Sequence, residues 1–140
     1  MSHAGMSHEN ALVKGLIVRL GGDAAVCALL GDPPRIHDDP PDEAVLPWLR
    51  IGRSVSRPVG ADGGGTEHRL GLTCVSGFRG AEEARAICAA IRVALEDAAP
   101  ATDGVRTVSL TTTSVEVFRS ADGRRTYGVM RLRAVTEDAI

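Results

Sequence analysis

The feature that most constrains this fold is a pair of long β-rich runs near the C-terminal end of the chain, within residues 105–137. The sequence Ser120-Ala121-Asp122-Gly123 separates them. Asp-Gly between β-rich segments predicts a hairpin, because glycine accepts the positive φ that such turns need. Each arm spans about a dozen residues, roughly twice the usual strand length. A ribbon of this length exceeds what the core of a small domain needs, and it indicates an element that contacts other subunits.

The first arm of this hairpin changes its hydrophobic parity along its length. Val108 and Leu110 share one face of a regular strand, whereas Val115 and Val117 have the opposite parity. One extra residue in a β-bulge moves the following side chains to the other face. We therefore expect a bulge between residues 111 and 114, which would bend the hairpin so that one half packs on the core and the other half leaves it.

Three helices are predicted upstream of the hairpin. Ser7 can cap a first helix that ends at Gly21-Gly22, and Asp23 can cap a short second helix over residues 24–30. Residues 81–98 place apolar side chains on one side of a helix and charged side chains on the other. This pattern is typical of a helix that packs on a core.

Two more strands precede the last helix. Period-two alternation predicts them over residues 46–55 and 67–75. The complete order is then helix–helix–strand–strand–helix–strand–strand. It predicts an α+β fold, namely a two-layer sandwich in which helices pack on one face of a four-stranded antiparallel sheet made of two hairpins.

Alternation within the strands assigns side chains to the two faces of this sheet. In the first strand, Leu49, Ile51 and Val55 should lie on the helix-covered face, with Arg50 and Ser54 on the other. The helix-covered face as a whole is predicted to carry Ile51, Leu70, Leu72, Leu110, Met130 and Leu132. The opposite face should be polar and should carry Arg50, Arg69, Arg131 and Arg133.

Two interpretations of the arginine face remain open. The arginines lie either on a solvated face with cross-strand partners such as Glu67, or on a surface that meets a neighbouring subunit or a nucleic-acid channel. Arginine is favoured at interfaces because its planar fork pairs with carboxylates. Trp48, the sole tryptophan, either closes one end of the core or anchors a neighbouring subunit. The candidate interface residues are therefore Trp48, Arg50, Arg69, Arg131 and Arg133.

The composition narrows the classes of function. The 140 residues are expected to form a single domain, 1–140, in which residues 1–7 are a flexible leader. A net charge of −2 gives no global attraction to phosphate, and 3% aromatic residues disfavour base stacking with single-stranded nucleic acid. Three cysteines without close spacing argue against a disulfide framework. Because no apolar run reaches the length of a membrane span, we expect a soluble protein with no membrane partner.

The sequence contains no pattern that predicts a catalytic, metal or cofactor site. His37 precedes Asp38 and Asp39, but adjacent residues in a proline-rich loop rarely converge on a metal ion. The glycine-rich run Gly60–Thr66 lacks the lysine and the following helix of a phosphate-binding loop. His68 lies mid-strand on the apolar parity and is expected at the edge of the packed face. We therefore expect no enzymatic activity and no cofactor.

Five segments, taken in order, carry a resemblance to a known family. They are the end of the leading helices Asp23–Gly31, the strand opening Leu46–Gly52, the strand Glu67–Ser76, the helix Ala81–Leu95 and the ending Gly128–Glu137. Their order and spacing resemble the tail-completion or tail-terminator family of long-tailed bacteriophages and phage-like gene transfer agents. The resemblance covers the chain from about Leu12 onward.

This resemblance implies a structural virion protein that caps the head-proximal end of a tail tube. Members of the family form hexameric rings, stop tube polymerisation and present a surface to the connector proteins of the head, while DNA passes through the lumen without specific binding. The implied partners are further copies of the chain, the tail tube protein and the head–tail connector, with assembly in the bacterial cytoplasm. The alternatives are another head–tail connector or head-completion protein, or a small cytosolic enzyme on a ferredoxin-like sandwich.

Overall fold

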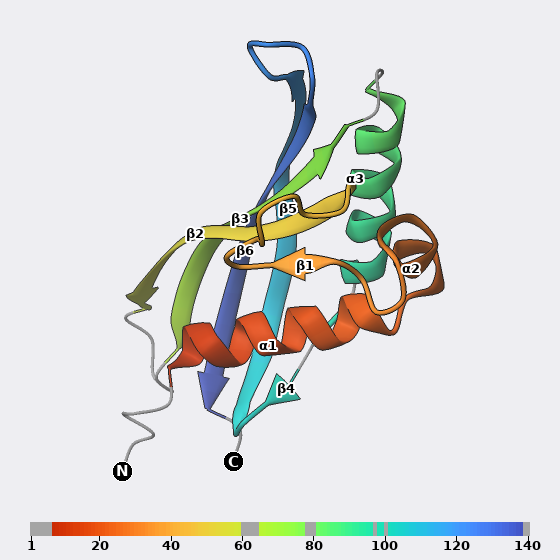
Figure 1. Cartoon of the computed structure of the whole chain (residues 1–140). Coiled ribbons are helices and arrows are strands. Elements are labelled where there is room, and N and C mark those ends of the chain that lie inside the picture. The colour runs from red at the N-terminus through yellow and green to blue at the C-terminus, as the bar shows by residue number, and fades with distance from the viewer. Residues whose placement is uncertain (1–6, 60–64, 78–80, 97, 100, 139–140) are drawn as a thin grey trace.

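The two β-rich runs form the predicted hairpin. Strands β5 (Val105–Arg119) and β6 (Thr126–Asp138) pair antiparallel over 15 and 13 residues. Figure 1 shows its tip standing out from the body of the molecule at the top of the view. The structure is a computed structural model that describes residues 7–59, 65–77, 81–96, 98–99 and 101–138.

The turn of the hairpin is fixed by its own hydrogen bonds. Gly123 has φ 71°, and its N–H donates to the carbonyl oxygen of Ser120 at 3.0 Å. Asp122 Oδ1 accepts from the Ser120 hydroxyl at 2.6 Å and from the Arg124 N–H at 3.0 Å. The hydrogen bond from Ser120 lowers the pKa of Asp122. The Asp-Gly prediction is therefore confirmed, since glycine tolerates this φ without a steric cost.

β5 contains two irregularities in its pairing with β6. One lies between Thr112 and Ser114, where the parity change predicted a bulge, and that prediction is confirmed. A second lies between Thr107 and Ser109 and was not predicted. Its extra residue is Val108, which is 54% exposed, so the prediction that Val108 shares a buried face with Leu110 is wrong.

The sheet is larger than the predicted one. In the described part of the chain it has six strands in the order β1-β2-β3-β6-β5-β4. The long inner strands are β2 (Trp48–Pro58), β3 (Thr66–Ser76), β6 and β5, and all of them pair antiparallel as predicted. The additions are β1 (Ile36–His37), parallel to β2, and β4 (Ala101–Thr102), antiparallel to β5. Strands of two residues have no detectable periodicity, which is why alternation missed them.

A bulge in β2 overturns two predicted face assignments, those of Val55 and Ser54. Ser54 was expected on the face of Arg50, but it pairs with the core residue Leu70 and lies on the helix-covered face. Ile51 lies opposite Leu72, but Ser54 lies opposite Leu70, so one extra residue sits in β2 between them. Val55 consequently points away from the helices and is 59% exposed. The prediction that Val55 shares a face with Ile51 and Leu49 is therefore wrong, because an extra residue reverses the alternation.

All three helices of the described residues cover one face of the sheet (Figure 1). Helix α1 (His8–Gly21) is capped by Ser7, whose hydroxyl accepts from the Asn10 N–H. α2 (Ala24–Leu30) is capped by Asp23, whose Oδ1 accepts from the Val26 N–H at 3.0 Å. Both caps are as predicted. α3 is Glu82–Leu95 and is shorter than predicted, because Glu96 already has an extended backbone with φ −65° and ψ 131°.

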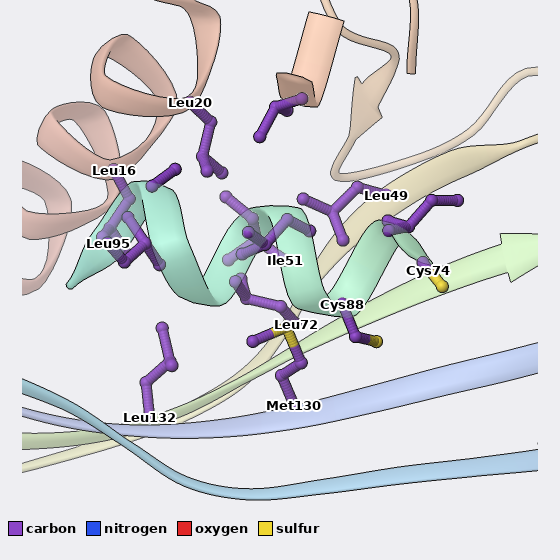
Figure 2. Packing of buried hydrophobic residues seen from close by; sticks show 14 of the residues in the cluster. Leu16, Leu20, Leu49, Ile51, Leu72, Cys74, Cys88, Leu95, Met130 and Leu132 are labelled. Carbon is purple, nitrogen blue, oxygen red and sulfur yellow. The ribbon is translucent and has the colours of Figure 1, made fainter. Parts of the chain in front are cut away.

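The core lies between these helices and the sheet. Figure 2 shows leucine, isoleucine and methionine side chains from α1, α3 and the central strands interlocking around α3. Leu72 is fully buried, and Met130 and Leu132 are 1% exposed. Leu110 is partly buried at the margin. The predicted apolar face of the sheet is thus confirmed, and it consists of Ile51, Leu70, Leu72, Leu110, Met130 and Leu132.

α3 packs tightly against the sheet at Gly128 of β6. A Cβ atom at this position would lie 2.7 Å from Cys88 Sγ on α3 and 2.9 Å from Cys74 Sγ on β3. Ordinary carbon contacts are about 3.5–4.0 Å. The missing side chain of Gly128 therefore makes room for the two thiols, and Cys74 and Cys88 are buried as free cysteines.

Candidate subunit interface

The face of the sheet without helices, called here the outer face, carries the four predicted arginines. Arg69 of β3 lies opposite Arg133 of β6, and Gly71 lies opposite Arg131. Arg50 of β2 lies opposite Thr73, which has the same parity as Arg69. Because directly paired residues project to the same side of a sheet, all four arginines share the outer face. That placement was predicted from alternation alone.

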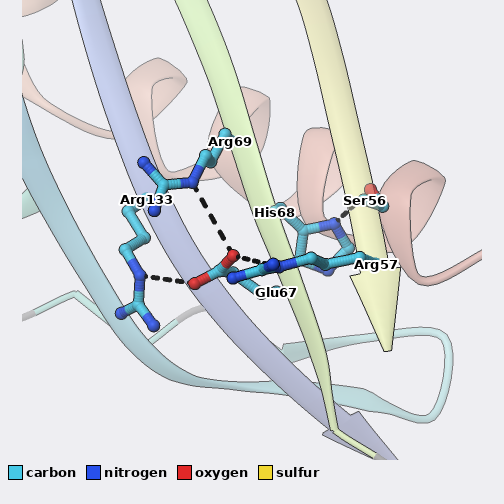
Figure 3. A network of polar contacts seen from close by, with 6 residues as sticks. All are labelled: Ser56, Arg57, Glu67, His68, Arg69 and Arg133. Carbon is cyan, nitrogen blue, oxygen red and sulfur yellow. Dashed lines mark hydrogen bonds and ion pairs between the residues drawn. The ribbon is translucent and has the colours of Figure 1, made fainter. Parts of the chain in front are cut away.

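Glu67 gathers three arginines at one end of the outer face (Figure 3). Its carboxylate accepts from Arg57 Nε at 2.8 Å and from Arg133 Nε at 2.7 Å, and Arg69 Nε lies 3.7 Å away. Glu67 itself is only 5% exposed. The hydrogen bond from Arg57, reinforced by Arg133, holds the pKa of Glu67 below its usual value even though burial acts in the opposite direction. The carboxylate offsets the repulsion that would otherwise separate Arg69 and Arg133.

Three other arginines of the outer face lack such a partner. Among the described residues, none forms an ion pair or a side-chain hydrogen bond with the guanidinium group of Arg50, Arg53 or Arg131, and all three side chains are exposed. The outer face is therefore divided into a part around Glu67, where the arginines are ion-paired, and a part where the arginines form no ion pair with a described residue.

A hollow of about 430 Å³ lies where these two parts meet. Arg53, Arg69 and Arg131 line it together with Gly52 and Gly71. The two glycines have no side chains, so the aliphatic parts of the arginine side chains surround a base of exposed backbone. We call this feature the arginine hollow. It has the size and charge to accept one or a few anionic groups from outside the subunit.

Trp48 is held inside its own subunit. The side chain is 7% exposed, and its ring packs edge-on against His37 with centroids 5.6 Å apart. Its indole Nε1 is buried without a hydrogen-bond partner among the described residues. Trp48 pairs with Val75 across β2 and β3, so the indole ring is buried within its own subunit at one end of the sheet.

The outer edge of β5 is open over most of its length. β4 pairs only with Val105 and Arg106. From Thr107 to Arg119, no described strand lies on that side of β5. Exposed strand edges are templates for pairing with another chain. The long hairpin thus presents both a free edge and a projecting tip to neighbouring molecules.

The polar groups outside the arginine face have structural roles. His68 is fully buried; its Nδ1 lies 2.8 Å from Ser56 Oγ and its Nε2 2.8 Å from Thr136 Oγ1. Burial lowers the pKa of His68, so the ring stays neutral and links three strands. Within the described ranges, no group of His, Cys, Asp or Glu residues has the arrangement of a metal site. Most of the glycine-rich run Gly60–Thr66 lies outside the described residues.

The alternation pattern does not predict that two further arginines, Arg53 and Arg57, lie on the arginine face. Arg53 lies in the β2 bulge, and the bulge moves it to the outer face beside Arg131. Arg57 follows the bulge and reaches Glu67 from there. Simple alternation from Arg50 assigns both residues to the opposite face. The available signal was the pair Gly52-Arg53, since an isolated glycine within a strand pattern often marks a bulge.

The described residues thus include a long hairpin with an open edge and a sheet face with unpaired arginines. The chain matches the model of the family described as tail completion protein gp17 over residues 14–137, and it belongs to that family. It is therefore a structural protein of a phage-type tail and not an enzyme.

Structural comparison agrees with this assignment at the level of the fold. A chain in the structure described as "Virion of native gene transfer agent (GTA) particle" superposes with a TM-score of 0.84 at 22% sequence identity. The alignment covers 97% of this chain and 99% of that chain. No curated protein sequence matches significantly. None of the described helices has the length and apolar character needed to cross a lipid bilayer.

Proposed function

We propose that this protein closes the head-proximal end of a phage-type tail tube as a hexameric ring. In this position it stops tube polymerisation and provides the surface on which the head connector docks. DNA passes through the lumen without specific binding. The chain is assembled in the bacterial cytoplasm and resides in the virion, at the head-proximal end of the tail.

One observation carries this proposal: the tail-completion family model matches residues 14–137, nearly the whole chain. The likeness to a chain in a gene transfer agent virion supports it, because the same fold occurs there over 97% of this chain. The hairpin adds a physical argument. Its 15-residue β5 strand has an open edge, and an exposed strand edge can pair with another chain.

The arginine face is the proposed contact between neighbouring subunits. A cyclic ring forms through heterologous contacts, in which one patch of a subunit meets a different patch of the next. Arg50 and Arg131 are exposed and unpaired among the described residues, so they are available to a neighbour. Arg69 and Arg133 already bind Glu67 and shape the face from within. Trp48 supports the same region from its buried position.

The proposal is tested by removing the gene and measuring the tails. Without the protein, tubes should grow beyond their normal length and should not join to heads, as seen by negative-stain electron microscopy. Purified protein added to tubes with open ends should appear at one end only. Tails of normal length that remain joined to heads would refute the proposal, and a cap at the end distal to the head would refute its location.

A further inference from the structure

The arginine hollow is lined by arginines without a carboxylate, whereas the arginines around Glu67 on the same face share one. Around Glu67, one buried carboxylate binds Arg57 and Arg133 directly and lies within reach of Arg69. Around the hollow, Arg53 and Arg131 lie on the same strands, and no described acidic residue lines it. Glu116 of β5 lies opposite the lining residue Val129, but it forms no ion pair with a described residue. The Glu67 cluster shows that arginines of this face can converge on a single carboxylate, and the unpaired guanidinium groups of Arg53 and Arg131 are available to a carboxylate from another molecule.

The chain itself carries a complementary surface at a different place. The loop between β1 and β2 contains Asp38, Asp39, Asp42 and Glu43, and all four side chains are exposed. None of these carboxylates forms an ion pair with a described residue. No lysine or arginine occurs between Arg35 and Arg50. The charge of a nearly neutral chain is therefore separated into an acidic loop at one sheet edge and an arginine hollow on the outer face.

We propose that the acidic loop of one subunit occupies the arginine hollow of the next subunit in the ring. Two different patches that complement each other are what a heterologous contact requires. Pro40 and Pro41 restrict the backbone of the loop, so less conformational freedom is lost on docking. The carboxylates complete the hydrogen bonding of Arg53 and Arg131. This inference rests on the proposed ring and adds to it the pair of surfaces that closes it.

The test exchanges charges between the two surfaces. One variant, Arg53→Glu with Arg131→Glu, makes the hollow acidic. The other, Asp38→Arg with Asp39→Arg and Asp42→Arg, makes the loop basic, because only Glu43 then remains acidic. In either variant alone, loop and hollow repel, so light scattering after size-exclusion chromatography should show single chains of 14.7 kDa. Wild-type protein should give six times that mass, and circular dichroism should show that all variants are folded.

Mixing the two variants in equal amounts should restore the ring. The acidic loop of one variant fits the basic hollow of the other, and the basic loop fits the acidic hollow, so the subunits alternate around an even-numbered ring. The charge-matched control Arg85→Glu with Arg92→Glu lies on α3, which packs on the opposite face of the sheet. This control should form the ring without a partner variant.

The outcomes separate this inference from the ring itself. Wild-type protein that stays monomeric both in solution and at tube ends would overturn the ring and the inference together. A wild-type ring with charge-exchanged variants that also form rings, or that fail to complement each other on mixing, would overturn only the loop-to-hollow contact. An Arg53→Glu, Arg131→Glu ring that forms normally but loses salt-dependent binding of a short DNA duplex would reassign the hollow to DNA.

Discussion

The close approach of α3 to the sheet at Gly128 makes Gly128→Ala the sharpest test of the packing. The added Cβ would lie 2.7 Å from Cys88 Sγ and 2.9 Å from Cys74 Sγ, on the order of 1 Å closer than ordinary contacts. It would also lie 3.6 Å from the backbone oxygen of Ala84. Because both sulfur atoms lie closer than 3.0 Å to the added Cβ, the two thiols must change rotamer or α3 must shift away from the sheet.

The expected cost is that of overpacking a buried site, about 1–3 kcal/mol. For a chain of this length, that corresponds to a fall in Tm of about 4–12 °C. Cys88→Ala removes the nearer sulfur atom. It should destabilise the wild-type protein by leaving a cavity, but it should be far less harmful, or stabilising, when Ala replaces Gly128. The two substitutions should therefore show a coupling energy of about 1 kcal/mol or more.

Urea unfolding at a fixed chain concentration, followed by circular dichroism, measures all four members of this cycle. Gly21→Ala is the matched control, because a Cβ at Gly21 meets nothing within 4 Å and that position ends α1. The control should be neutral or slightly stabilising. Equal midpoints for Gly128→Ala and Gly21→Ala, or the same cost of Cys88→Ala in both backgrounds, would refute this account of the packing.

Three further predictions concern stability. Glu67→Gln should lower the free energy of unfolding at neutral pH. Because the pKa of Glu67 is lowered in the folded protein, the charged carboxylate stabilises the fold above its unfolded pKa of about 4.3, and this stabilisation is lost as the pH falls through the folded pKa. Urea midpoints of the variant and the wild type should therefore converge in acid. Asp23→Ala should cost about 0.5–2 kcal/mol by removing the α2 cap, whereas exposed Asp39→Ala should be nearly neutral in the same assay. Leu72→Ala should cost about 2–5 kcal/mol, because Leu72 is fully buried; a calorimetric Tm near wild type would contradict this.

The hairpin could be predicted because its signals are local. Asp122-Gly123 fixes the turn through the φ of Gly123, and the parity change between Leu110 and Val115 identifies the bulge. In β2 the opposite happened. Val55 is apolar and keeps the parity of Ile51, so the alternation gives no sign of the extra residue. Gly52 is the one local signal of a bulge, and the register with β3 shows where it lies. An exposed valine at a sheet surface is ordinary and leaves no warning in the sequence.

The sequence predicted that the arginines share one face of the sheet. It did not predict which of them pair with Glu67 and which remain unpaired. Alternation placed Arg69, Arg131 and Arg133 together, and Glu67 was identified as a partner. Which arginines remain unpaired depends on Arg57 reaching across from β2 after the bulge. The burial of Glu67 likewise depends on side chains from neighbouring strands. Such contacts follow from register and rotamers, which a single sequence does not reveal.

The most direct test of the account is a cryo-electron microscopy reconstruction of the intact head–tail junction. The account predicts six copies of this chain in one ring at the head-proximal end of the tube, with the loop of residues 38–43 from each subunit in the arginine hollow beside Arg131 of the next. A different copy number, a location away from this end of the tube, or an arginine face turned toward the lumen would contradict it.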